Sequence, residues 1–314
     1  MYKTRKSIIS LLMAMVMMLA FCMPAMASEP EPTIIANAAT QGAYMYNVET
    51  QEQSFVSASS YARTSSSRSM PQYIPSSAVA DSKVVTPPDS RTKVSSPSGR
   101  YSNTVLLIVK FEGQAEIAVS GWMIGPKTVA TAGHCVYKYG KGWAESINVY
   151  PGASGGNYPF GSASAINMWA GGDYVANDGN YAAGVYDDWG VIELDSNLGN
   201  QTGWLGLVAA ENYSSVAGAT FQTNGYPADL ENANVSTGNE WMYTCYGSFT
   251  GSKPRFLPTM YINIDFAGGQ SGSPIYRNFS DTGYSAQAIG VAGDNQTIAV
   301  LINNWLFDFY MSVR

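Results

Sequence analysis

Histidine is the scarcest of the chemically versatile residues in this sequence. The 314 residues contain one, His134, and three cysteines. Protein zinc sites are built mostly from histidine and cysteine ligands, and this chain shows no such cluster. A glycine-rich phosphate loop placed before a helix is missing as well. We therefore expect neither a metal site nor a bound cofactor.

Charged residues are also sparse, and the positive sign is the rarer one. Lysine and arginine number 17 against 23 aspartates and glutamates, so the formal net charge is −6. Proteins that bind nucleic acids usually carry a basic excess, because the phosphate backbone is anionic. This composition argues against nucleic acid as the main partner.

The N-terminal 27 residues have the three zones of a secretory signal peptide. Three of the first six residues are basic, residues 8–21 are uncharged and mostly apolar, and residues 25–27 form a small-x-small pattern. The apolar run is about 14 residues long, whereas a transmembrane helix needs roughly 20. We expect cleavage after Ala27, a secreted, extracellular protein and no stable membrane association. An uncleaved membrane anchor is the alternative.

Residues 28–83 differ in composition from the rest of the chain. They are rich in Ser, Ala, Pro and Gln and have no sustained apolar period. Such a stretch buries too little apolar surface to offset the entropy lost on ordering. We expect a largely disordered propeptide that is released on maturation, or alternatively a flexible N-terminal linker of the mature protein.

From residue 84 onward, short β-prone runs alternate with turn clusters of Gly, Asn, Asp and Pro. This texture is typical of an all-β sandwich or barrel. The last stretch differs, because its apolar residues recur at steps of three and four, which predicts one C-terminal amphipathic helix. The predicted strands include Val105–Phe111, Ile117–Met123, Ile147–Tyr150, Gly190–Leu194, Phe221–Thr223, Trp241–Tyr246, Met260–Ile264 and Ala288–Ala292.

Two cysteines remain once the signal peptide is removed, Cys135 and Cys245. An oxidising compartment allows them to form a disulfide. A disulfide between them would close a loop of about 110 residues, for which the chain-entropy model gives about 4–5 kcal/mol of stabilisation. The sequence allows two free thiols equally well, so both possibilities stay open.

Three segments carry side chains suited to nucleophilic catalysis. The histidine ends the run Thr131-Ala132-Gly133-His134, which follows a β-prone stretch. The serine stands in Gly268-Gly269-Gln270-Ser271-Gly272, where glycines let the backbone approach a substrate carbonyl and present N–H groups to it. A serine hydroxyl is a weak nucleophile and needs a neighbouring base.

The third segment supplies an acidic partner for the imidazole. Asp188 opens the apolar run 189–194, and a carboxylate there can accept the imidazole N–H and set its tautomer. Asp187 is a rival, and we prefer Asp188 because it directly heads the strand. The order His134, Asp188, Ser271 is that of chymotrypsin-type enzymes. A lipase or esterase of the α/β-hydrolase fold is disfavoured, because Ser273 replaces the last glycine of that motif.

Segments 121–135, 188–194 and 270–278 resemble the glutamyl endopeptidases of Gram-positive bacteria, a branch of the chymotrypsin-like (trypsin-like) serine proteases. The resemblance implies two six-stranded β-barrels with the triad in the cleft between them, within a protease domain at 84–314. It implies His134, Asp188 and Ser271 as the triad. The N–H groups of Gly269 and Ser271 would form the oxyanion hole. We expect a monomer that cleaves protein or peptide substrates through an acyl-enzyme.

The resemblance also bears on maturation. Residues 84–91 resemble the start of mature family members, which places activation after Lys83 and lets the ammonium group of Val84 help to recognise an acidic side chain. Trypsin-like zymogens pair their new N-terminus with an aspartate just before the nucleophile. Gln270 stands there instead, so activation by that ion pair is not expected.

The substrate pocket departs from the family pattern. A histidine and a threonine that usually contact the substrate glutamate are replaced by Ala292 and Phe266, and a carboxylate buried without partners is costly. Preference for Glu or Asp before the cut therefore stays open. Asp265, six residues before the nucleophile, offers Lys or Arg preference as an alternative unless it points elsewhere. An apolar preference is another alternative. An inactive homologue acting as a binding protein is disfavoured by the intact triad.

Overall fold

The computed structural model describes residues 42–60, 68–75, 89–180, 184–210, 213–230, 240–252, 259–293 and 296–314. The predicted signal peptide, the cleavage site after Lys83 and Val84 lie outside the described residues. Within the described ranges, no helix has the length and hydropathy needed to cross a membrane.

The first barrel is a ring of six antiparallel strands. β10 pairs with β5 on one side and with the start of β11 on the other, and this second pairing closes the ring β10-β5-β6-β7-β12-β11. Large apolar side chains such as Trp122 and Ile192 fill its interior and are fully buried. The strands are β5 (Thr104–Lys110), β6 (Ile117–Met123), β7 (Thr128–Thr131), β10 (Ser146–Pro151), β11 (Ala163–Gly171) and β12 (Gly190–Leu194).

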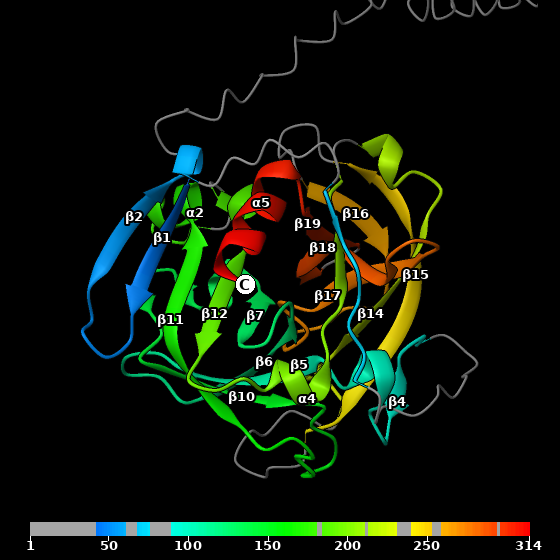
Figure 1. Ribbon diagram of the computed structural model, residues 1–314, viewed down its shortest axis with the longest axis horizontal. Helices are drawn as coiled ribbons and strands as arrows, with labels where there is room; N and C mark the ends of the chain where they lie inside the picture. Colours follow the sequence, from blue (N-terminus) through cyan, green and yellow to red (C-terminus); the bar gives the residue numbers. More distant parts are fainter. Residues whose placement is uncertain are drawn as a thin grey trace, which may run out of the picture. The chain divides into compact units, whose positions relative to one another are not determined.

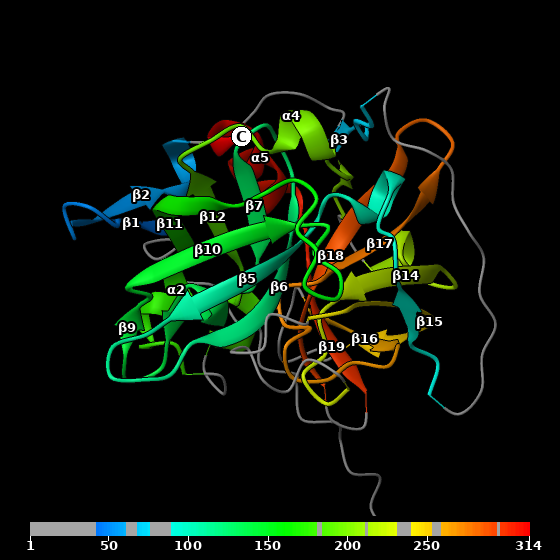
Figure 2. The same cartoon turned by 90° about the horizontal axis from the view of Figure 1, so that it is seen from below.

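The second barrel repeats this plan. β17 pairs with β14 and with β18, which closes the ring β17-β14-β15-β16-β19-β18. Figure 2 shows the two barrels side by side, the first in green and the second in yellow and orange. Two closed six-stranded barrels confirm the predicted all-β fold. The strands are β14 (Thr220–Gly225), β15 (Met242–Ser252), β16 (Thr259–Asn263), β17 (Pro274–Phe279), β18 (Gly283–Gly293) and β19 (Thr297–Leu301).

Shorter elements join or extend the barrels. β4 pairs with the start of β15, β13 runs parallel to β18, and β8 and β9 form a small hairpin after the histidine turn. They are β4 (Thr92–Val94), β8 (Tyr137–Lys138), β9 (Gly142–Trp143), β13 (Gly206–Val208), α2 (Gly172–Ala176), α4 (Gly199–Thr202) and the 3₁₀ turns η1 (Ala58–Ser60), η2 (Gly99–Tyr101), η3 (Gly133–Cys135), η4 (Val185–Asp187) and η5 (Tyr213–Ser215).

The described part of residues 28–83 is ordered, so the expectation of a largely disordered stretch is wrong for residues 42–60 and 68–75. β1 (Gly42–Asn47) and β2 (Gln53–Ser57) form a hairpin whose first strand pairs with the free edge of β11. β3 (Ser69–Met70) pairs with β13. These strands need no core of their own, because they take hydrogen bonds from existing sheet edges. The amino-acid composition of residues 28–83 carries no information about hydrogen bonds to distant strands. Release of the segment stays a prediction.

Side chains reinforce this N-terminal addition. Tyr46 stacks on Trp143 with ring centroids 5.4 Å apart, and Arg68 forms an ion pair of 3.0 Å with buried Asp308. Asp308 lies on the C-terminal helix, so the contact joins the segment that precedes the predicted cleavage site to that helix. Ala43 is fully buried as well. Residues 42–75 therefore contact the barrels through both backbone pairing and side-chain packing wherever they are described.

The C-terminal helix is present as α5 (Asn304–Val313). Asn303 caps it by accepting a hydrogen bond from the N–H of Leu306 at 2.8 Å. Phe309 packs on Trp189 with ring centroids 5.0 Å apart (Figure 1 shows α5 in red). Because Trp189 directly follows Asp188, this helix supports the segment that carries the acidic residue of the predicted triad. The helix starts after Leu301, which belongs to β19 instead.

Candidate active site

His134 lies in a short turn at the end of a barrel strand. β7 ends at Thr131, and η3 then turns the chain with a hydrogen bond of 3.1 Å from the N–H of Cys135 to the carbonyl of Ala132. A Cβ on Gly133 would lie 3.0 Å from Oδ1 of Asp188. Glycine therefore lets this turn close tightly against the aspartate.

Asp188 binds His134 through both carboxylate oxygens. Its Oδ2 lies 2.8 Å from Nδ1 of the imidazole, and its Oδ1 accepts the His134 backbone N–H at 2.8 Å. The Asp188 side chain is 1% exposed, whereas that of His134 is 31% exposed. The two bonds fix the ring and leave its Nε2 edge as the part that can face a substrate.

The electrostatic environment of His134 follows from the same contact. Burial alone would lower the pKa of His134, because it disfavours the charged imidazolium. Burial is the largest single effect, but the charge and hydrogen bond of Asp188, together with Cys135, outweigh it and raise the pKa of His134 well above its usual range. An aspartate in this position stabilises the imidazolium that forms when the histidine accepts a proton.

Asp187, the rival acidic residue, has different partners. Its Oδ1 accepts the indole N–H of Trp189 at 2.6 Å, and its Oδ2 accepts the backbone N–H of Asp173 at 2.8 Å. Burial raises the pKa of Asp187 to about 7. Its contacts are with the α2 turn and the indole, while Asp188 is the aspartate hydrogen-bonded to the imidazole.

Ser271 lies in the loop between β16 and β17, against the first barrel. Its carbonyl accepts the N–H of Ser120 on β6 at 3.0 Å. The next residue, Gly272, has φ +85°, and a Cβ there would lie 2.1 Å from Oγ1 of Thr131, at the end of β7. Only glycine permits this approach. The glycine thus brings the serine loop of the second barrel against the strand that leads to the histidine.

The residues predicted to form an oxyanion hole flank a tight turn. Gly269 has φ +88°, and a Cβ there would lie 2.4 Å from the carbonyl of Tyr226. The carbonyl of Gly269 accepts the hydroxyl of Ser120 at 2.8 Å, which holds the turn. Within the described ranges, the N–H groups of Gly269 and Ser271 donate to no protein acceptor. Both donors are thus available to a substrate oxygen.

Two of the predicted pocket residues, Phe266 and Ala292, pack against different apolar clusters. The Phe266 ring covers Gly290 of β18, where a Cβ would lie 2.5 Å from Cε2 of the ring. Ala292 is half-buried, pairs with Ile298 and packs against the apolar core. Their role in a substrate pocket stays a prediction.

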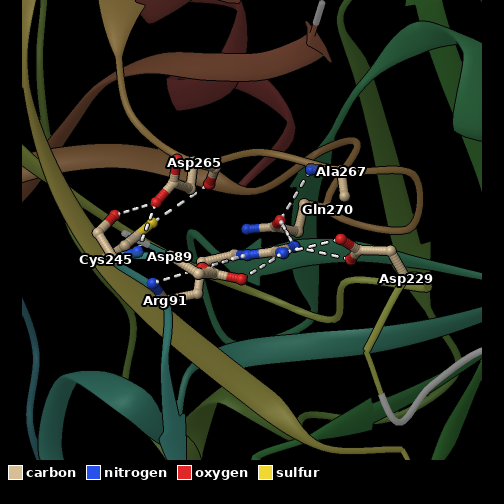
Figure 3. Close-up of polar contacts among 8 residues, drawn as sticks. Asp89, Arg91, Asp229, Cys245, Asp265, Ala267 and Gln270 are labelled. Carbon is tan, nitrogen blue, oxygen red and sulfur yellow. Dashed lines mark hydrogen bonds and ion pairs between the residues drawn. The ribbon is translucent and has the colours of Figure 1, made fainter. Parts of the chain in front are cut away.

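Asp265 has a partner that the sequence does not reveal. Its Oδ2 accepts the backbone N–H of Ser90 at 2.6 Å and also the Ser90 hydroxyl. Ser90 precedes Arg91, whose guanidinium pairs with Asp89 and Asp229 beside the nucleophile loop (Figure 3). We missed this cluster in the sequence. Asp89 and Arg91 are visible there as charges, but Asp229 lies 138 residues after Arg91 and no pattern relates the two.

The possible disulfide is not formed. Cys135 and Cys245 are both free and buried. Each thiol has its own backbone acceptor, Cys135 the carbonyl of Ser271 at 3.7 Å and Cys245 the carbonyl of Asp265 at 3.3 Å. The two cysteines belong to different barrels, Cys135 to the turn after β7 and Cys245 to β15. Burial raises the pKa of Cys245 to about 12, so its thiol stays protonated at neutral pH.

Two closed six-stranded barrels, with a histidine–aspartate pair on one and a glycine-flanked serine on the other, define the chymotrypsin-like class of serine proteases. A family model described as Trypsin matches residues 98–304. The chain belongs to the trypsin family.

Individual relatives narrow this family to one branch. The chain is 33% identical over 207 residues to "Glutamyl endopeptidase" of Bacillus licheniformis, covering 66% of this chain and 58% of the relative. It is 34% identical over 227 residues to "Extracellular metalloprotease" of Bacillus subtilis, covering 70% of this chain and 66% of the relative. The alignments therefore span less than two thirds of either relative.

A solved structure supports the same branch. "Structure of Glu endopeptidase in complex with MPD" matches with a TM-score of 0.58 and 26% identity, over 74% of this chain and all of that one. The resemblance to the glutamyl endopeptidase-like branch is thereby confirmed. The word "metalloprotease" in the name of the Bacillus subtilis relative describes that protein. Among the residues described here, no three His, Cys, Asp or Glu side chains gather as metal ligands.

Proposed function

We propose that this protein is an exported serine endopeptidase that works through a His134–Asp188–Ser271 triad and an acyl-enzyme. The two-point contact of Asp188 with His134, beside the Ser271 loop, is the observation that carries the proposal. His134 removes the Ser271 proton as the hydroxyl attacks a peptide carbonyl. Asp188 stabilises the resulting imidazolium. The N–H groups of Gly269 and Ser271 bind the tetrahedral oxyanion, and water then hydrolyses the acyl-enzyme.

The test is cleavage of a peptide library by the wild type and by Ser271→Ala. The variant should lose the triad-dependent turnover, while its circular dichroism stays that of the wild type. Ser273→Ala is the matched control, because Ser273 is buried two residues away and its hydroxyl has no partner among the described residues. Cleavage by Ser271→Ala at the wild-type rate would overturn the proposal. Absence of cleavage by the wild type would favour the binding-protein alternative.

The same library identifies the residue preferred before the cut. We expect Glu or Asp there, as the names of two relatives suggest for those proteins. The ammonium group of Val84 would then supply the positive charge, because Phe266 and Ala292 offer only apolar surface. Cleavage after Lys or Arg would instead require Asp265 to leave Ser90. Cleavage after apolar residues would mean that Phe266 and Ala292 dominate the pocket.

Maturation is the remaining part of the proposal. Cleavage after Lys83 would leave Val84 as the first residue of the exported enzyme. Mass spectrometry of the secreted protein should find that N-terminus, and a stable product that begins at Ser28 would contradict it. Strands β1, β2 and β3 precede this site, so their release requires breaking the pairings with β11 and β13.

A further inference from the structure

A segment of three residues just before β4 contacts the loop that carries the nucleophile. It consists of Asp89, Ser90 and Arg91, and the contacts come from Ser90 and Arg91. Figure 3 shows the Arg91 side chain lying between Asp89 and Asp229, with Gln270 beside it. Gln270 immediately precedes Ser271. None of these contacts belongs to the triad, so they need a separate explanation.

Arg91 has the geometry of a fixed cation. Its Nη1 and Nη2 each lie 2.7 Å from an oxygen of Asp229, and its Nε and Nη2 lie 3.1 and 2.9 Å from the oxygens of Asp89. The Arg91 side chain is 7% exposed, while both aspartates are about half-exposed. A planar guanidinium held by two bidentate carboxylates has one orientation. Hydrogen bonding to Asp229 raises the pKa of Arg91, so the charge persists at all working pH values.

Gln270 connects this cation to residues 267–271, the turn that carries the N–H groups of Gly269 and Ser271 and is called the oxyanion turn. Its side chain is fully buried, and its Oε1 lies 3.5 Å from Nη1 of Arg91. The same oxygen accepts the backbone N–H of Ala267 at 2.9 Å. The backbone N–H of Gln270 donates to the Ala267 carbonyl at 3.1 Å. Gln270 therefore closes the turn 267–270 from both its backbone and its side chain, with Arg91 against the oxygen that does so.

The other partner of Arg91 supports the same turn from the opposite side. Asp229 follows Ala228, whose N–H donates to the carbonyl of Gly268 at 2.7 Å. Tyr226 of the same loop has its carbonyl where a Cβ on Gly269 would lie. Loop 226–229 therefore contacts the oxyanion turn at Gly268 and Gly269. The Arg91 guanidinium contacts one side chain of this loop, Asp229, and one side chain of the turn, Gln270.

Ser90 adds a third contact at the base of the loop. Its N–H and hydroxyl both donate to Asp265, two residues before Ala267. The segment 89–91 therefore touches the nucleophile loop at its start, through Asp265, and next to the nucleophile, through Gln270.

We propose that Arg91 is a positioning residue for catalysis: through Gln270 and Asp229 it holds turn 267–271 so that the N–H groups of Gly269 and Ser271 point at the developing oxyanion. The inference rests on the proposed function. Its chemical consequence is specific. Loss of the guanidinium loosens donors used in the transition state, and it leaves the His134–Asp188 pair in place.

The experiment compares Arg91→Met with Arg277→Met in the mature enzyme. Arg277 is a half-buried arginine of the same barrel that stacks near Phe279, away from the nucleophile loop. We expect Arg91→Met to lower kcat by about 10- to 100-fold, the range that small misplacement of catalytic groups produces. KM should change by no more than about twofold, because this interaction matters only in the transition state. Arg277→Met should keep the kcat of the wild type.

Binding of a transition-state analogue separates positioning from loss of folded enzyme. A peptidyl trifluoromethyl ketone forms a tetrahedral adduct on Ser271 whose oxyanion needs the same donors. Its affinity should fall in Arg91→Met by the factor lost from kcat, measured on enzyme quantified by active-site titration. An unchanged kcat per titrated site, or an unchanged affinity for the ketone, would overturn the inference.

Two further variants keep the inference testable if Arg91→Met does not fold. Asp229→Asn changes a half-exposed side chain, and it should lower kcat while Asp281→Asn, an exposed control, does not. In a double-mutant cycle, Asp229→Asn with Gln270→Met should lose less than the product of the two single losses, because both variants act through the Arg91 guanidinium. Additive losses would contradict this route. A wild type without Ser271-dependent cleavage would instead refute the proposed function, so the two failures are distinguishable.

Discussion

The two barrels hold their parts of the active site by different means. The first barrel positions His134 with a residue of its own, since Asp188 heads β12 and β12 pairs with β7 just before the histidine turn. The second barrel carries Ser271 on a loop supported from outside the strands, by Ser120 of the first barrel and by segment 89–91. The comparison teaches that the base is held by the barrel's own sheet, whereas the oxyanion turn depends on contacts from other parts of the chain.

The largest effect should come from removing the internal support of the first barrel. Asp188→Asn is expected to lower kcat by about 10⁴-fold, as in other triads, because the amide favours the wrong histidine tautomer. Circular dichroism should show an intact fold. Asp187→Asn is the control, since Asp187 bonds to Trp189 and Asp173 and not to the imidazole. Equal losses in the two variants would mean that the roles of the two aspartates are not separate.

The contact between the barrels is tested at a glycine. Gly272→Ala should destabilise the enzyme by about 2–4 kcal/mol, because the residue has φ +85° and the new Cβ would lie 2.1 Å from Thr131 Oγ1. Gly268→Ala, four residues earlier, meets no atom within 4 Å and should change stability by less than about 1 kcal/mol. Urea unfolding measures both. If Gly272→Ala were as stable as Gly268→Ala, the close approach would be wrong.

The pH dependence tests the charge of the Asp188–His134 pair. Catalysis needs neutral His134, and the pKa of His134 is raised well above its usual value, so kcat/KM should fall with decreasing pH through a limb above about pH 6.5. The same raised pKa stabilises the fold fully below the unfolded-state pKa. That contribution is lost as pH rises through the folded-state pKa. If kcat/KM fell only below about pH 6, the raised pKa of His134 and its pairing with Asp188 would be contradicted.

The smallest effect should come from the thiols, one on each barrel. Because Cys135 and Cys245 are free, a reducing agent should shift the melting temperature by less than about 2 °C, whereas loss of a disulfide would cost several kcal/mol. Mass spectrometry of the denatured protein should count two thiols. A disulfide between them would link the two barrels covalently and would contradict the two free thiols of the structure.

Much of this structure was predictable, because its signals are local. The strand predicted at Gly190–Leu194 and the one at Ile117–Met123 have the bounds found in the structure. The His134 and Ser271 motifs stand out because glycine positions are tightly constrained there. The C-terminal helix was predicted from its period, although Leu301 went to a strand because β18 offered it a pairing partner.

The failures concern contacts between distant segments. Strands β1 and β2 were missed because β1 pairs with the edge of β11, more than a hundred residues later, and β2 pairs with β1. Whether Cys135 and Cys245 form a disulfide could not be predicted from neighbouring residues either, because the distance between the two thiols depends on how both barrels fold. Arg91 looked like an ordinary charge until its two carboxylates were seen around it.

The class of fold and the chemical types at the centre of the site can be inferred from the sequence, since the order histidine, aspartate, serine and the glycines near them carry that information within short windows. Three contacts depend on the folded chain instead: the bond of one aspartate to the imidazole, the bond of Asp265 to Ser90, and the place of Arg91 beside the oxyanion turn. The reason is physical. Strand period and turn geometry act between neighbours in the chain, whereas ion pairs and sheet edges join whatever folding brings within a few ångströms.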